Sequence, residues 1–154
     1  MSYLKAGDII SGQEGKLTAK MPDGTIEVMA YVKSFEATME KQKSEIKVLG
    51  HRGTQHKTTG WSGSGSMNIY YITPIFRAMA LKYAKTGVDT NFQLTAENND
   101  PASSVGKQTS VLYGCNVDAT VIAKLDVDNT ELDEDLDFTF DDFDILDQFG
   151  KPTI

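Results

Sequence analysis

The sequence predicts a mainly β protein, a small β-barrel or sandwich of six to eight strands with one flanking α-helix at about residues 74–86. Three observations lead to this fold. Apolar and polar residues alternate along most of the chain, turn-forming residues separate the alternating runs, and a single segment carries apolar residues at helical spacing. With 154 residues, the chain has the length of one domain, 1–154, with its own core.

The first third of the chain combines a turn with an unusually long strand. Residues 1–14 show little pattern and are expected to form an irregular arm. Met21-Pro-Asp-Gly24 predicts a turn, because Pro fixes φ and Gly accepts positive φ. An alternating run extends from Thr25 to about Lys41, and its apolar face switches sides near Lys33. A bulge, or a strand that passes from one neighbour to another, would produce this switch.

A basic, glycine-containing stretch follows. Residues 50–60 contain no apolar side chain and include Arg52 and Lys57, which predicts a flexible basic loop. Residues 61–72 then form a strand whose first half is almost bare of side chains. Glycine in a strand usually marks the close approach of another backbone.

The predicted helix has recognisable ends. Thr73 suits the cap, Pro74 the first helical position and Gly87 the stop. Its apolar residues share one face and are expected to be core: Ile75, Phe76, Met79, Ala80 and Tyr83.

The second half of the chain is again β in pattern. Strands are predicted at residues 91–97 and 108–113, and the cleanest alternation in the chain predicts a further strand at residues 117–127. In the last strand, Phe138 and Phe140 share a face but Phe143 lies on the other, which indicates a bent strand.

Charge is distributed unevenly along the chain. Residues 126–147 contain eleven acidic side chains and no Lys or Arg, and the net charge is −7. Residues 1–125 carry a net +3 and residues 126–154 a net −10. Such a chain can meet copies of itself through patches of opposite charge, whereas nonspecific binding to nucleic acid or anionic lipid is disfavoured.

No arrangement of residues predicts catalysis, a cofactor or a metal site. The acidic run from Asp126 lacks the glycine that a calcium-binding loop needs at its sixth position, where Glu131 stands. His51 and His56 have no neighbouring cysteine or carboxylate with which to hold zinc. Cys115 adjoins a clean core pattern, so a buried, inert thiol is expected rather than a nucleophile. We therefore expect a protein that is not an enzyme.

Three further signals also have simpler explanations. Gly60, Gly63 and Gly65 lead into a strand and lack the Gly-Lys-Ser/Thr of a phosphate loop. Trp61, Tyr70 and Tyr71 could stack on nucleic-acid bases, but no cations are interleaved with them as in a nucleic-acid stacking platform. No apolar run approaches the roughly 20 residues of a membrane helix, so no membrane partner is expected.

The segment Gly60-Trp-Ser-Gly-Ser-Gly-Ser-Met-Asn-Ile-Tyr-Tyr-Ile-Thr-Pro-Ile-Phe-Arg77 resembles the tail tube proteins of long-tailed phages and phage-like particles, above all those of PBSX-like contractile prophages. The likeness spans nearly the whole chain. It implies a self-assembling virion subunit that forms stacked hexameric rings, with a sheath outside and with baseplate and tape-measure partners. DNA would pass through the lumen without specific binding, and the subunit would be assembled in the bacterial cytoplasm.

The same resemblance implies which regions work in assembly. The strand at residues 25–41 would help to line the lumen, and the basic loop would reach a neighbouring subunit or the next ring. The expected contact residues are His51, Arg52, His56, Lys57 and Trp61. Two alternatives remain open: a ring protein like those of the type VI secretion apparatus, and a monomeric β-barrel that binds an apolar ligand beside Trp61.

Overall fold

The computed structural model describes residues 3–151, which form eight β-strands, one α-helix and one short 3-10 helix. In chain order the elements are η1 (Ala6–Asp8), β1 (Gly15–Lys20), β2 (Ile26–Val28), β3 (Val32–Ile46), β4 (Gln55–Tyr70), α1 (Ile75–Thr86), β5 (Phe92–Asn99), β6 (Lys107–Val117), β7 (Asp133–Phe140) and β8 (Asp142–Asp147). The prediction of a mainly β fold with a single α-helix is confirmed.

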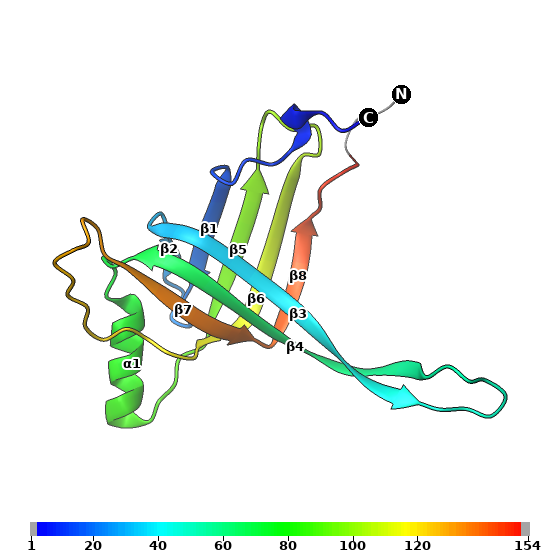
Figure 1. The fold of residues 1–154 in the computed structure, drawn as a ribbon. Coiled ribbons are helices and arrows are strands. Elements are labelled where there is room, and N and C mark those ends of the chain that lie inside the picture. Colours follow the sequence, from blue (N-terminus) through cyan, green and yellow to red (C-terminus); the bar gives the residue numbers. More distant parts are fainter. Residues whose placement is uncertain (1–2, 152–154) are drawn as a thin grey trace.

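The strands form two layers that cross over one another (Figure 1). The five-stranded layer has the order β2-β1-β5-β6-β8, and the three-stranded layer has the order β3-β4-β7. Strand β6 belongs to both, because most of it pairs with β5 and β8 while Asn116 and Val117 pair with β7. All pairings are antiparallel.

Strands β7 and β8 are one bent strand, as the switch of apolar face predicts. Before Asp141 the strand pairs with β4, and after it the strand pairs with β6. The bend packs tightly on Gly114 of β6, whose φ of +66° suits glycine. The Asp141 N–H donates to the Tyr113 carbonyl at 2.9 Å, and a Cβ on Gly114 would lie 2.4 Å from the Asp141 carboxylate. The bend carries the chain from one layer to the other.

The first switch of apolar face has two structural causes. The predicted strand at residues 25–41 is in fact two strands, because the chain leaves β1 after β2 and joins β4 through β3. In addition, the pairing register of β3 with β4 shifts at Lys33, which is the bulge that the sequence suggests. Strand β3 continues without a break to Ile46.

The bare half of β4 accommodates aromatic rings rather than a neighbouring backbone alone. Gly63 and Gly65 lie directly opposite Phe140 and Phe138 of β7. A Cβ on either glycine would stand 2.4 Å from the facing ring, and at Gly65 it would also lie 2.6 Å from the Glu36 carbonyl oxygen. The two rings therefore occupy the space that side chains on β4 would need.

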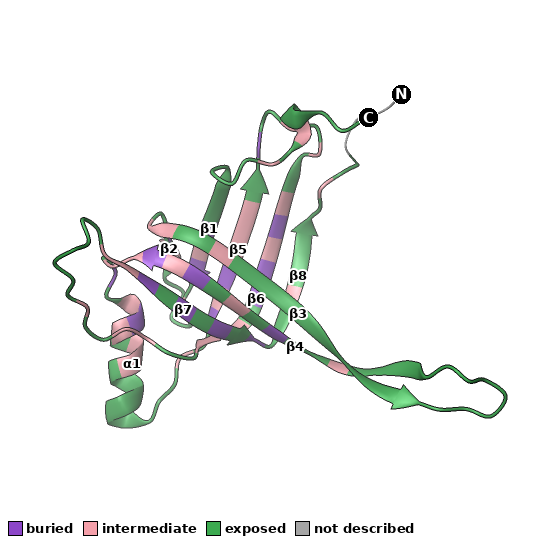
Figure 2. Cartoon of the chain, in the orientation of Figure 1, coloured by how far each residue is buried: buried purple, intermediate pink, exposed green. Residues whose placement is uncertain are grey.

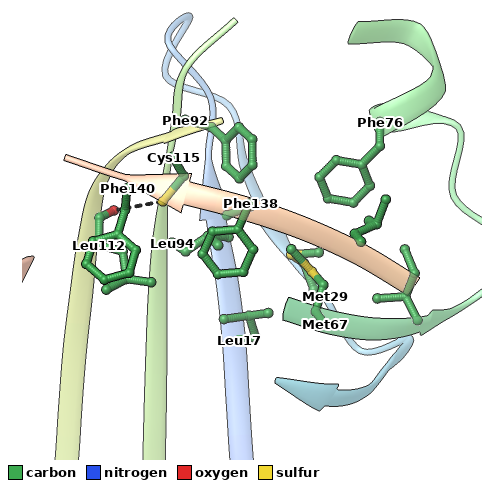
Figure 3. Close-up of a cluster of buried hydrophobic side chains, with 13 residues drawn as sticks. Leu17, Met29, Met67, Phe76, Phe92, Leu94, Leu112, Cys115, Phe138 and Phe140 are labelled. Atoms are coloured by element: carbon green, nitrogen blue, oxygen red, sulfur yellow. Dashed lines mark hydrogen bonds between the residues drawn. The ribbon is translucent and has the colours of Figure 1, made fainter. Parts of the chain in front are cut away.

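The core lies between the two layers (Figure 3). Thirteen buried apolar residues from β1, the β2–β3 connection, β4, α1, β5, β6 and β7 form one cluster. Cys115 is fully buried in it, next to the Leu112 carbonyl at 3.5 Å. Because these side chains fill the space where an apolar ligand would sit, the ligand-binding barrel is disfavoured.

Helix α1 begins and ends close to the expected positions. Gly87 ends it with a φ of +74° and donates to the Tyr83 carbonyl at 2.8 Å. Pro74 is the cap residue, and the Thr73 hydroxyl accepts a long hydrogen bond of 3.5 Å from the Ile75 N–H. Phe76 is buried, but Tyr83 is exposed and was wrongly expected in the core.

Two other expectations differ from the structure, whereas the lead-in at residues 3–14 is irregular apart from η1. Residues 118–132 contain no strand, so the strand predicted at 117–127 is wrong beyond Val117. Residues 55–60, expected in a loop, are paired within β4, so the turn spans residues 47–54. The lead-in before β1 is tied down, because Asp8 accepts hydrogen bonds from Ser103 through its carbonyl and from the Ser104 N–H through its carboxylate.

A buried ion pair holds α1 against the three-stranded layer. Arg77 contacts both carboxylate oxygens of Glu134 on β7, at 3.1 and 3.2 Å, and Glu134 is fully buried. The same guanidinium stacks over the Tyr71 ring at 4.3 Å and donates to the backbone carbonyls of Thr73 and Val121. One side chain thus joins α1, the end of β4, β7 and the segment after β6.

We expect Gly65→Ala to destabilise the fold by about 1–3 kcal/mol, because the new methyl group overpacks the Phe138 ring. Urea denaturation followed by circular dichroism measures the change. Gly60→Ala is the matched control, since its nearest atom is a flexible Gln42 side-chain oxygen at 3.5 Å. Equal stability of the Gly65 and Gly60 variants would contradict this account of the bare strand.

We expect Arg77→Met to cost about 3–5 kcal/mol, because it leaves the buried Glu134 carboxylate without its partner. Adding Glu134→Leu should recover much of the loss, since no unpaired charge then remains. A double-mutant cycle in chemical denaturation measures the coupling. Strictly additive effects would show that the two residues do not act as a pair.

Candidate assembly surfaces

The most prominent feature of the surface is an arm formed by the ends of β3 and β4. The arm, defined as residues 41–60, projects beyond the body of the protein, and almost all of it is exposed (Figures 1 and 2). Its two strands pair with one another, with a second register shift between Gln42 and Lys43. No residue of the arm belongs to the core cluster.

Four of the five predicted contact residues lie on this arm. His51 and Arg52 are in the turn, whereas His56 and Lys57 are in β4 opposite Glu45 and Ser44. The structure thus brings these four exposed side chains together at one end of the molecule.

The arm is strongly basic. It carries the cations Lys41, Lys43, Lys47, Arg52 and Lys57 and one acidic residue, Glu45, which is a net charge of +4. None of the cations forms an ion pair within residues 3–151. Their charge is therefore available to an acidic surface elsewhere.

Trp61 lies at the base of the arm rather than on it. Its ring meets the Phe143 ring edge to face at 5.5 Å and lies 6.2 Å from the Phe140 ring. This aromatic cluster fixes the arm to the bend between β7 and β8. The Trp61 ring remains partly exposed, and its contact with another subunit stays a prediction.

Both layers have unpaired edges. Within the described chain, β3 pairs with β4 alone and β8 pairs with β6 alone. Their outer backbone N–H and C=O groups can pair with a strand of another molecule. An apolar cleft lies between these two edges, lined by Phe35, Ala37, Met39, Phe143 and Ile145.

The outward side of the three-stranded layer is polar and acidic. It is formed by the residues that alternate with the core positions: Glu36, Thr38 and Glu40 of β3, Ser62, Ser64, Ser66 and Asn68 of β4, and Asp133, Asp135, Asp137 and Thr139 of β7. We call it the acidic face. It contains five carboxylates, and its small serine and threonine side chains surround a shallow depression.

Charge neutralisation on the acidic face is confined to one end. Lys33 donates to Asp133 at 3.0 Å, which lowers the pKa of that carboxyl group, and Lys124 lies 3.6 Å from the same carboxylate. Asp137, Glu36 and Glu40 form no ion pair within the described chain. The sequence signal of this face is the alternation of serine with glycine in β4 and of aspartate with mainly apolar residues in β7.

The acidic run predicted from the sequence is divided among five places, one of which is the bend at Asp141. Glu134 is buried against Arg77, Asp135 lies on the acidic face, and Asp144 lies on β8. Asp126 and Asp128 lie on the segment of residues 118–132, which we call the acidic loop. A single charged surface does not result, because strand alternation and the bend send neighbouring carboxylates to different sides.

Cys115, the one cysteine of the chain, is unreactive at neutral pH. Burial raises the pKa of the Cys115 thiol to about 12, so it stays protonated at neutral pH and is not a nucleophile. Among the described residues, no three His, Cys, Asp or Glu side chains gather as a metal would require, and no helix could span a membrane.

Comparisons with known proteins agree with these features. A family model described as phage tail tube protein matches residues 2–147. The phage-like element PBSX protein XkdM of Bacillus subtilis (strain 168) is 45% identical over 142 residues, which cover 92% of this chain and 93% of that protein.

Solved structures share the fold at low sequence identity. A chain of the anti-feeding prophage baseplate, 6-fold symmetrised, matches with a TM-score of 0.66 at 11% identity, covering 95% of this chain and 97% of that one. A chain of the sheath/tube terminator of an extracellular contractile injection system matches with a TM-score of 0.63 at 9% identity, covering 86% and 94%.

The family match also decides between a phage tail tube protein and a type VI ring protein in favour of the first. The chain belongs to the phage tail tube protein family, and its role is that of a structural tail tube subunit.

Proposed function

We propose that this chain closes into six-membered rings that stack into the inner tube of a contractile, phage-like tail. The observation that carries the proposal is the pair of free edges on β3 and β8 beside a basic arm that has no partner in its own chain. Six-fold symmetry in one structural neighbour, and a sheath and tube in another, support the same assembly. The sheath and baseplate are its partners, and the rings form in the bacterial cytoplasm before the tail is complete.

Strand pairing between copies gives the ring its stability. A two-stranded hairpin is marginally stable by itself in water, so the arm gains from a surface that covers it. An edge of one copy that pairs with a different edge of the next makes a head-to-tail interface, which closes into a ring when the rotation between copies allows it. Closure removes the free edges of β3 and β8, which could otherwise recruit unrelated chains.

The acidic face is suited to line the lumen of such a tube. Its side chains are short and polar, so they offer a smooth wall, and its five carboxylates repel the phosphates of DNA. Screening limits this repulsion to roughly 8 Å at physiological salt, so only charges close to the passing DNA contribute. A wall of this kind lets DNA or another acidic cargo slide without being held.

Assembly of the purified protein tests the proposal directly. Electron microscopy and light scattering at increasing concentration are expected to show rings or tubes. Replacing residues 47–54 by Asn-Gly shortens the arm and should weaken stacking while the melting temperature changes little, because the turn contributes nothing to the core. A wild-type protein that stays monomeric at every concentration, even with its sheath and baseplate partners, would refute the tube.

Reversing charge on the acidic face tests its place in the lumen. Tubes of a Glu36→Lys/Asp137→Lys variant are expected to retain DNA in a salt-dependent manner, whereas wild-type tubes release it. Filter retention of labelled DNA at several salt concentrations measures the difference. A Glu14→Lys/Glu97→Lys variant has the same net charge with the new cations away from the acidic face and from the β3 and β8 edges, and equal DNA retention by both would place the acidic face outside the lumen.

A further inference from the structure

We propose that the tip of the arm docks on the acidic loop of a second copy of this chain, an inference that rests on the proposed self-assembly and names the surface that receives the arm. Both surfaces are unpartnered in the single chain. They are opposite in charge and alike in exposing apolar side chains.

The tip of the arm carries exposed apolar residues among cations. Leu49 is fully exposed at the turn, and Ile46 and Val48 are 39% and 43% exposed. Lys47 and Arg52 flank them. A surface that combines apolar side chains with unpaired cations fits a partner that is both apolar and acidic.

The acidic loop is such a surface. Leu125 and Val127 are 97% and 98% exposed, which is unusual for two large apolar residues so close in sequence. Three acidic residues alternate with these two apolar residues or follow them: Asp126, Asp128 and Glu131. None of the three forms an ion pair within the described chain. The loop therefore offers a charge opposite to that of the tip, together with apolar area that the apolar side chains of the tip can cover.

The loop also has the sequence of a strand without a strand to pair with. Apolar residues alternate with others from Val117 to Val127, yet the last pairing is the Asp118 N–H with the Asp137 carbonyl at 2.8 Å. Beyond that point, Arg77 contacts the Val121 carbonyl at 3.5 Å and Lys124 donates to the Asp133 carbonyl at 2.6 Å. These two contacts hold the loop against the body while its apolar side chains stay outside.

The positions of the two surfaces make the contact intermolecular. The arm projects from one end of the three-stranded layer, and the acidic loop lies at the other end, beside α1 (Figure 1). A contact between opposite ends of identical molecules is head-to-tail, so each added copy presents a new tip or loop. This geometry suits growth of a tube.

Charge reversal on each surface tests the contact. The tip variant is Lys47→Glu/Arg52→Glu, and the loop variant is Asp128→Lys/Glu131→Lys. Asp126 is left unchanged, because its carboxylate accepts hydrogen bonds from Asp128 and Asn129 and shapes the loop. Each variant alone should raise the concentration needed for assembly by about tenfold or more, since like charges then face one another.

Mixing the two variants gives a stronger test than either alone. The tip variant has an acidic tip and an acidic loop, and the loop variant has a basic tip and a basic loop. In the mixture, the tip of each variant can therefore dock on the oppositely charged loop of the other. The mixture should therefore assemble near the wild-type concentration, in an alternating order. Lys82→Glu/Lys85→Glu on exposed α1 makes the same charge change as the tip variant and should assemble normally.

Disulfide trapping provides a second measurement that does not depend on charge. The chain has a single cysteine, Cys115, which is buried and whose thiol pKa is raised to about 12, so it does not compete. Oxidation of a Leu49→Cys/Leu125→Cys variant should give a ladder of cross-linked multimers, whereas either substitution alone stops at dimers.

The outcomes separate this inference from the proposed function. If the wild-type protein does not assemble, the tube itself is refuted. If it assembles but the reversed variants assemble equally well and no ladder forms, the tube stands and the docking of tip on loop is overturned. Loss of sheath binding by the loop variant, with tubes intact, would assign the loop to the sheath and would also overturn the proposal.

Discussion

The structure depends on the contact between the bare stretch of β4 and two phenylalanine rings of β7. Phe138 and Phe140 lie across Gly63 and Gly65, and no other residue type leaves room for them. With the rings in place, the two layers close on a filled core and β7 is positioned to bend into β8. The serines of the same stretch point to the opposite side. One segment therefore both accommodates the two core rings and forms part of the acidic face.

The arm begins beyond the point where the contact between β4 and the two phenylalanine rings ends. The core ends near Phe140 and Trp61, but β3 and β4 continue as a pair well beyond them. The continued strands bury nothing in their own chain, so their stability has to come from elsewhere. The described chain likewise provides no partner for the outer edges of β3 and β8. It also provides none to cover the exposed apolar side chains at the two ends of the molecule. In the proposed assembly, neighbouring copies would cover these surfaces.

In the proposed assembly, charge would set the direction in which copies meet. A basic arm at one end and an acidic loop at the other favour head-to-tail contact and disfavour contact between like ends. The carboxylates of the acidic face lie where, in the proposed tube, they would repel a phosphate backbone. The net charge of −7 therefore says less about assembly than the distribution of charge over the arm, the acidic loop and the acidic face.

The sequence by itself determined the features that depend on short-range rules. The alternation of apolar and polar residues predicts most of the strands. Gly24 indicates a turn and Gly87 the end of α1. The change of apolar face after Phe140 predicts the bend between β7 and β8. These signals are readable because side-chain period and positive φ are properties of a few consecutive residues.

Tertiary structure decided whatever depends on a partner far along the chain. Residues 118–132 alternate like a strand but lie in a loop, because β7 already occupies the place beside β4 and the end of β6. Residues 55–60 are polar and show no hydrophobic pattern, so their place in β4 depends on their pairing with residues 42–46 of β3. Glu134 is buried among exposed carboxylates because Arg77, 57 residues earlier, lies beside it in space and supplies the opposite charge.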